Sequence, residues 1–170
     1  IALVPALRLA ASPAAASSLK TSYLYQVAAL SGPLRTSAAT LSYDARHREL
    51  YVVSDGLVRV VNQAGMEVFT WAQDSELGPV YGVAALEDGD VLALHYRGGD
   101  LALVRCNFRG EPLGEVPVDG LSGFRASHMA YRDGKLYLAN LGDARTVAVV
   151  DLAARRVIRT AGALVFAAMA

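Results

Sequence analysis

The sequence predicts an all-β fold assembled from three repeated units, each made of four short antiparallel strands. Apolar and polar residues alternate in short runs, which is the pattern of half-buried strands. The pattern returns three times, with Tyr51, Leu92 and Tyr137 at equivalent places, 41 and then 45 residues apart. Turn signals rich in Gly, Asp and Asn separate the runs. Four strands in a period of about 40–45 residues are typical of a β-propeller blade.

Each unit begins with a run that we expect to form the innermost strand of a blade. A tight turn and a second strand follow this run. Two of the turns contain Asp-Gly, a strong hairpin signal because both central positions of such a turn favour positive φ. The first runs are 38–44, 80–88 and 127–133, and the turns are 45–48, Asp88-Gly89 and Asp133-Gly134.

The second half of each unit predicts two more strands. The third strands are expected at 57–63, 101–108 and 146–152, and the fourth strands at 66–71, 111–118 and 156–162. Helical repeats of similar period are disfavoured by the two-residue alternation and by the Val, Tyr and Leu content. A β-sandwich also consists of short strands with regular turns. The correspondence between units favours the propeller.

The segments that flank the units have a different character. Residues 1–18 are apolar and Ala-rich, like the late part of a secretory signal, although Pro5 and Arg8 interrupt the run. We expect an exported protein, periplasmic or extracellular, and the alternative is a retained apolar tail that packs on a partner. The full division is 1–18 signal-like or ordered tail, 19–37 lone strand and candidate ring-closing strand, 38–79, 80–124 and 125–162 blades, and 163–170 start of a further strand.

Two segments resemble NHL-type repeats. They are "SDGLVRVVNQAGMEV" and "EDGDVLALHYRGGDLALVRCNFRGEPL". In such repeats a glycine-turned hairpin precedes a valine-containing strand and an Asx-x-x-Gly turn. The resemblance extends over about residues 38 to 162, and the third unit departs from it because Asp151–Ala154 lacks the turn glycine. It implies a propeller, which in this family usually has about six blades.

Three blades form an arc whose two end sheets present apolar faces to water. Burial of such faces is worth about 25 cal/mol per Å², so we expect them to be covered. The candidates are a second half-propeller, supplied by the same chain or by a homodimer, and a different protein partner.

Composition excludes several classes of function. Lys plus Arg and Asp plus Glu are equal at 16 each, and no basic stripe is present, so we expect no nucleic acid as partner. The single cysteine, Cys106, excludes an internal disulfide framework and is expected to be a buried, inert thiol. No apolar run reaches the roughly 20 residues of a transmembrane helix. No nucleophile elbow indicates a Ser-His-Asp set.

One histidine is a candidate metal ligand. His128 lies just before an innermost strand, where NHL-like amidating lyases carry a zinc-binding histidine, so the resemblance implies this role for His128. The other units have Thr40 and Gly82 at this place, whereas a catalytic zinc site needs about three protein ligands. A metal-dependent lyase or lactonase, with Zn or with Ca held partly by Asn140 and Asp143, is therefore the alternative function. A channel-lining histidine is the default interpretation.

Four other residues are candidates for contact with a protein partner. Arg, Tyr and Trp dominate protein–protein hot spots, and tyrosines that pack between blades are the structural alternative. The sequence therefore predicts a non-catalytic binding or assembly module without a cofactor, which contacts its partner through a channel mouth or a blade edge. The candidates, all near predicted blade edges or inner-strand loops, are Arg125, Tyr81, Tyr131 and Trp71.

Overall fold

The computed structural model describes residues 39–72, 76–140 and 146–162. These residues form twelve strands, and no helix is present among them. The predicted segments 1–18, 19–37 and 163–170 lie outside the described residues. The strands are β1 (Thr40–Asp44), β2 (Glu49–Ser54), β3 (Leu57–Val61), β4 (Glu67–Trp71), β5 (Val80–Ala85), β6 (Val91–Arg97), β7 (Asp100–Cys106), β8 (Pro112–Glu115), β9 (His128–Arg132), β10 (Lys135–Asn140), β11 (Thr146–Asp151) and β12 (Arg156–Gly162).

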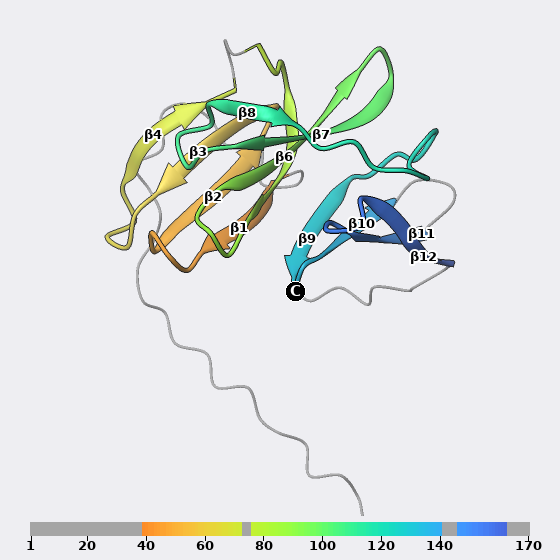
Figure 1. The fold of residues 1–170 in the computed structure, drawn as a ribbon. Coiled ribbons are helices and arrows are strands. Elements are labelled where there is room, and N and C mark those ends of the chain that lie inside the picture. Colours follow the sequence, from red (N-terminus) through yellow and green to blue (C-terminus); the bar gives the residue numbers. More distant parts are fainter. Residues whose placement is uncertain (1–38, 73–75, 141–145, 163–170) are drawn as a thin grey trace, which may run out of the picture.

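The strands form three four-stranded antiparallel sheets, and each sheet contains only consecutive strands. We call them sheet 1 (β1-β2-β3-β4), sheet 2 (β5-β6-β7-β8) and sheet 3 (β9-β10-β11-β12). The first strands β1, β5 and β9 are neighbours, and the later strands of each sheet lie progressively farther out (Figure 1). This arrangement confirms the predicted all-β fold of four-stranded, blade-like sheets.

All three sheets share one irregularity, which allows their residues to be matched. The pairing of the third and fourth strands shifts by one residue after Val60, Arg105 and Val149. When the three sheets are aligned at this shift, three rows of cross-strand neighbours become equivalent. The rows are Ser42-Tyr51-Val60-Phe69 in sheet 1, Ala84-Leu92-Arg105-Gly114 in sheet 2 and Ala130-Tyr137-Val149-Arg159 in sheet 3. The sequence-based equivalence of Tyr51, Leu92 and Tyr137 is therefore confirmed.

Two hydrophobic cores hold the sheets together. Alternation along β6 directs Val91 and Ala93 into the core shared with sheet 1, and Leu92 and Leu94 into the core shared with sheet 3. The middle sheet is thus apolar on both faces. Strand β6 is therefore buried on both sides.

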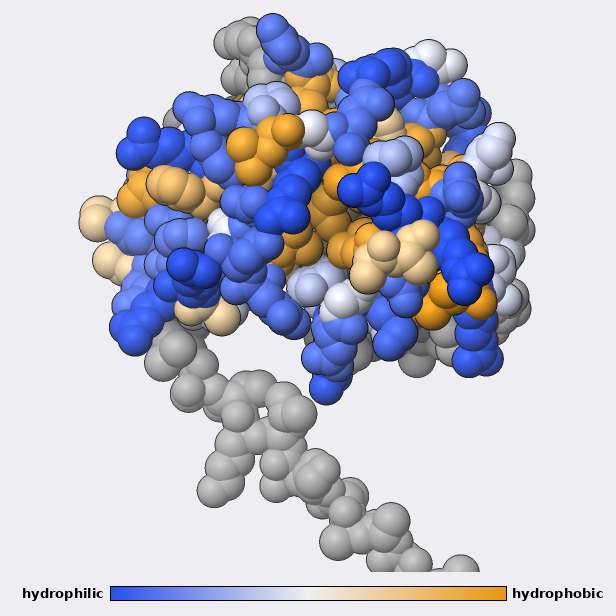
Figure 2. Space-filling model, viewed as in Figure 1, coloured by the Kyte–Doolittle hydropathy of each residue, from blue (hydrophilic) through white to orange (hydrophobic). Residues whose placement is uncertain are grey.

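The outward face of sheet 3 is less covered than the equivalent faces. Tyr51 is 0% exposed and Leu92 is 1% exposed, whereas Tyr137, on the matching row, is 37% exposed. The face seen in Figure 2 is largely hydrophilic, with hydrophobic residues in separate patches. Within the described residues, the outward face of sheet 3 is therefore partly open.

The turns follow the predicted geometry in part. Asp133 and Gly134 both have positive φ, at 50° and 73°, as the hairpin signal predicts. At Asp88-Gly89 only Gly89 has positive φ. That turn is longer, because the Leu86 carbonyl accepts the Gly89 N–H and the Asp88 carboxylate accepts the Asp90 N–H. The expectation of two left-handed residues was therefore wrong at this turn.

Candidate functional site

The beginning of the inner strands brings together one residue from each unit. Cross-strand pairing places Thr40, Gly82 and His128 at equivalent positions of β1, β5 and β9. A Cβ on Gly82 would lie only 2.9 Å from the Met129 sulfur. A side chain at position 82 would therefore displace the Met129 side chain, because β5 and β9 approach closely.

His128 is exposed at this end of β9. Its Nδ1 lies 3.2 Å from the Ser127 hydroxyl oxygen. Among the described residues, no three His, Cys, Asp or Glu side chains are grouped so that they could hold a metal ion. Asn140 ends β10, half-buried, and Asp143 lies outside the described residues. His128 therefore has no matching set of ligands in the described part of the chain.

Two tyrosines meet near the start of β5. Tyr81 is the extra residue of a β-bulge in β5 and is 47% exposed. Its ring packs edge-on against Tyr96 of β6, with ring centroids 5.2 Å apart. The Tyr96 hydroxyl donates a 2.8 Å hydrogen bond to the Ala126 carbonyl. Burial raises the pKa of Tyr96, so this phenol stays protonated and remains a donor.

Arg125 completes this group. It is exposed, its charge is close enough to favour ionisation of Tyr96, and it makes no ion pair with any described residue. We call Tyr81, Tyr96, Arg125 and His128 the mouth cluster. Tyr96 was not predicted, because strand alternation does not show which aromatic residue of a neighbouring strand lies under Tyr81.

The other two predicted contact residues lie elsewhere. Trp71 is 8% exposed and belongs to the core between sheets 1 and 2, where a Cβ on Gly110 would overlap its indole. Tyr131 is half-buried at the opposite end of the inner strands. Neither residue joins the mouth cluster, and we do not include them in the proposal below.

The opposite end of the inner strands carries a groove of about 520 Å³. Each sheet contributes the turn between its first two strands. The groove contains acidic, basic and aromatic side chains, and we call it the turn groove. Its lining is Tyr43, Asp44, Ala45, Arg46, Ala85, Leu86, Glu87, Tyr131, Arg132 and Asp133.

Asp44 organises the first wall of the turn groove. Its carboxylate accepts hydrogen bonds from the backbone N–H groups of Arg46 and His47 and pairs with the His47 ring at 2.7 Å. Burial alone would raise the pKa of Asp44, but these hydrogen bonds hold it below its ordinary value. His47 also stacks on Phe108, with ring centroids 5.0 Å apart. His47 is thus exposed at the surface and held on both sides by these contacts.

Two buried residues, Cys106 and His95, belong to neither the mouth cluster nor the turn groove. Cys106 is 0% exposed, and burial raises the pKa of its thiol to about 11, in agreement with the predicted inert thiol. His95 is 2% exposed, because β6 continues to Arg97 and so includes His95 in the sheet.

Comparison with known proteins identifies no family. No protein-family model matches the sequence, and no curated protein resembles it. Similar solved structures include a protein of unknown function from Bacteroides caccae (12% identity, 71% of this chain, 44% of that chain, TM-score 0.48). Another is the Pan2 WD40 domain of Neurospora crassa (12% identity, 68% of this chain, 33% of that chain, TM-score 0.48). A third is hydrazine synthase of Kuenenia stuttgartiensis (16% identity, 72% of this chain, 36% of that chain, TM-score 0.47).

The chain spans less than half the length of each of these three structures. At these identities and TM-scores the likeness says nothing about the function of this chain. Its fold is established by the strand order and register of its own sheets. No helix in the described ranges is long and apolar enough to cross a membrane. The described part of the chain is all-β, and its three consecutive four-stranded antiparallel sheets have the connectivity of β-propeller blades.

Proposed function

We propose that this chain is a non-catalytic binding or assembly module that contacts a protein partner through the mouth cluster. The observation that carries the proposal is the exposed Tyr81 ring, which is held edge-on by Tyr96 beside an arginine without an ion pair among the described residues. Tyrosine and arginine provide large contact area and directed hydrogen bonds at interfaces. The fixed position of Tyr96, through its bond to Ala126, reduces the entropy lost on binding.

The test begins with site-specific crosslinking in cells that produce the full chain. Tyr81 is replaced by photoreactive benzoylphenylalanine, and Val68, an exposed bulge residue of sheet 1, is replaced in the same way as a control. We expect a specific crosslinked protein from position 81 and none in common with position 68. Absence of a specific crosslink at position 81 contradicts the proposal.

The captured protein is then purified and titrated with variants. Arg125→Glu is expected to weaken binding by about tenfold or more, because it reverses the charge of a hot-spot residue. Arg48→Glu makes the same charge change at an exposed turn of sheet 1 and is expected to leave binding unchanged. Equal affinity of wild type and Arg125→Glu would exclude the mouth cluster as the contact surface.

A relationship to NHL repeats is a finer part of the proposal. It is supported by two matching turns, in which the side-chain oxygens of Asn62 and Asn107 each accept two backbone N–H groups of the turn that follows. Gly65 and Gly110 take the left-handed position of these turns. The third turn is one residue longer, and Arg155 takes the left-handed position at φ 51°.

We further propose that the protein is exported and that a second half-propeller covers the open face of sheet 3. The signal-like composition of residues 1–18 supports export, and the exposure of Tyr137 supports the cover. The proposal requires no cofactor. We do not propose the lyase or lactonase alternative, because His128 has no companion ligands among the described residues.

A further inference from the structure

The two interfaces between sheets are built on the same register but are filled differently. In the first interface, two aromatic side chains of β4 fill the outer part of the gap between sheets 1 and 2. Phe69 packs against the core, and the indole of Trp71 lies over Gly110 of the β7–β8 turn.

The matching positions of sheet 2 carry small side chains. The shared bulge aligns Gly114 with Phe69 and, two residues later, Val116 with Trp71. On the facing sheet, the β11–β12 turn has Arg155 in the left-handed position that Gly110 occupies in the β7–β8 turn. The second interface therefore lacks both aromatic rings that close the first one.

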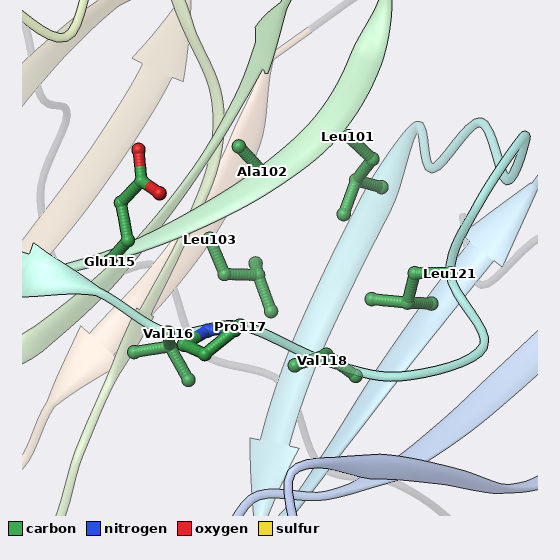
Figure 3. A pocket seen from close by; sticks show the side chains of 8 residues that line it. All are labelled: Leu101, Ala102, Leu103, Glu115, Val116, Pro117, Val118 and Leu121. Carbon is green, nitrogen blue, oxygen red and sulfur yellow. The ribbon is translucent and has the colours of Figure 1, made fainter.

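A groove of about 260 Å³ lies where these rings are missing. A smaller cavity of about 140 Å³ borders Val116 as well, and Leu101, Leu103 and Leu121 project toward it (Figure 3). The larger space, which we call the inter-sheet groove, has a lining of mixed polarity, with leucine side chains beside charged ones. It consists of Leu86, Leu92, Arg105, Leu113, Gly114, Glu115, Val116, Leu152 and Arg155.

The charged side chains at the inter-sheet groove differ in whether they already form an ion pair within the described residues. Arg105 is held by Asp88 and Asp90, with a 2.6 Å contact from its Nε to Asp90. Glu115 is paired with Arg97. Arg155 is exposed and has no ion pair with any described residue. Arg105 with its two aspartates carries a net negative charge that balances Arg155, so these groups sum to zero. The side chain of Arg155 is nevertheless open to pairing with a carboxylate of whatever occupies the groove.

We propose that the inter-sheet groove binds a short extended segment of another protein, which inserts one large apolar side chain, Phe or Leu, beside an acidic residue that pairs with Arg155. The inserted side chain takes the place that Phe69 and Trp71 fill in the first interface. Leu113, 58% exposed on the bulge of β8, covers the inserted side chain from the outer edge. This surface is separate from the mouth cluster and does not depend on it.

The test uses fluorescein-labelled hexapeptides of sequence Gly-Ser-X-Z-Ser-Gly with the full chain. X is Phe, Leu or Asn, and Z is Asp or Lys. Fluorescence polarisation is expected to show saturable binding when X is Phe or Leu and Z is Asp. Replacement of X by Asn, or of Z by Lys, is expected to weaken binding by about tenfold or more.

Matched variants locate the binding site. Leu113→Ser and Arg155→Glu are expected to weaken binding of the Phe-Asp peptide by about tenfold. Their controls, Val68→Ser and Arg48→Glu, change the equivalent bulge and a left-handed turn residue in sheet 1 and are expected to have no effect. Val116→Trp restores the ring of the first interface and is expected to abolish binding, and a thermal melt checks that each variant is folded.

Three outcomes overturn the proposal. The first is that no peptide binds at millimolar concentration, which includes the case of a groove already filled by another segment of this chain. The second is that Phe-Asp and Asn-Lys peptides bind equally. The third is that Leu113→Ser and Arg155→Glu, both folded, bind as well as wild type. Arg125→Glu should leave peptide binding unchanged, so failure here is distinct from failure of the mouth cluster.

Discussion

At Asp44, burial and hydrogen bonding act in opposite directions on one carboxylate. The residue is 1% exposed, yet the hydrogen bonds from His47 and from two backbone N–H groups keep its pKa low. The other titratable groups beside it are Glu49 and Tyr51, whose pKa values are raised, first of all by burial. The charged Asp44 carboxylate therefore holds the β1–β2 turn together through these hydrogen bonds, and its contribution to stability depends on pH.

We predict that Asp44→Asn lowers the free energy of unfolding by about 1–2 kcal/mol at about pH 7. The native pKa of Asp44 lies below its ordinary value of 3.8, so its stabilising effect is complete above that value and is lost as the pH falls through the native pKa. The difference between wild type and Asp44→Asn should thus shrink at about pH 3. Urea unfolding at the two pH values measures it, with Asp100→Asn as an exposed control. A difference that does not depend on pH contradicts this role.

The strands and turns differ in how fully they could be predicted. The first, third and fourth strands of each sheet fall within a predicted run or within one residue of it, because two-residue alternation is a property of the strand itself. The Asp88-Gly89 turn was misjudged because the Asp88 side chain bonds its own turn and lengthens it. The bulges were not predicted, because an extra residue in an outer strand leaves the local apolar pattern almost unchanged.

We predict that Arg48→Gly raises the free energy of unfolding by about 0.5–1 kcal/mol. Arg48 ends the β1–β2 turn at φ 57°, a left-handed conformation that is unfavourable for a residue with a Cβ. Its exposed side chain has no hydrogen bond or ion pair with a described residue, so little is lost with it. Chemical denaturation measures the change, and Arg109→Gly at a position without positive φ is the control. Destabilisation by Arg48→Gly would show that its side chain contributes more than the strain.

On the scale of the whole molecule, stability depends on faces between sheets. Each sheet has two faces, and the middle one is apolar on both. Tyr51 and Leu92 are fully buried, whereas Tyr137 at the matching position is only partly covered. Side chains at equivalent positions of the repeat therefore contribute different amounts to the free energy of unfolding.

We predict that, in residues 1–170 alone and without the proposed second half-propeller, Tyr51→Ala costs about 3–5 kcal/mol of stability, whereas Tyr137→Ala costs about 1 kcal/mol or less. The reason is that Tyr51 is packed between two sheets and Tyr137 is 37% exposed at the end of the stack. Thermal and urea unfolding of both variants, with sedimentation velocity to record association, give the comparison. Equal costs at the two positions would show that sheet 3 is covered as fully as sheet 1.

The sequence by itself determined the strands, their order and the repeat, because alternation and turn residues act through the local backbone. The tertiary structure alone decided which side chains meet: Tyr81 with Tyr96, and His47 with Asp44 and Phe108. It also decided that Gly114 and Val116 stand opposite Arg155 where the first interface has Phe69 and Trp71. The physical reason is that contacts between sheets depend on register and on side-chain volume in a neighbouring unit, which a pattern along one strand does not contain.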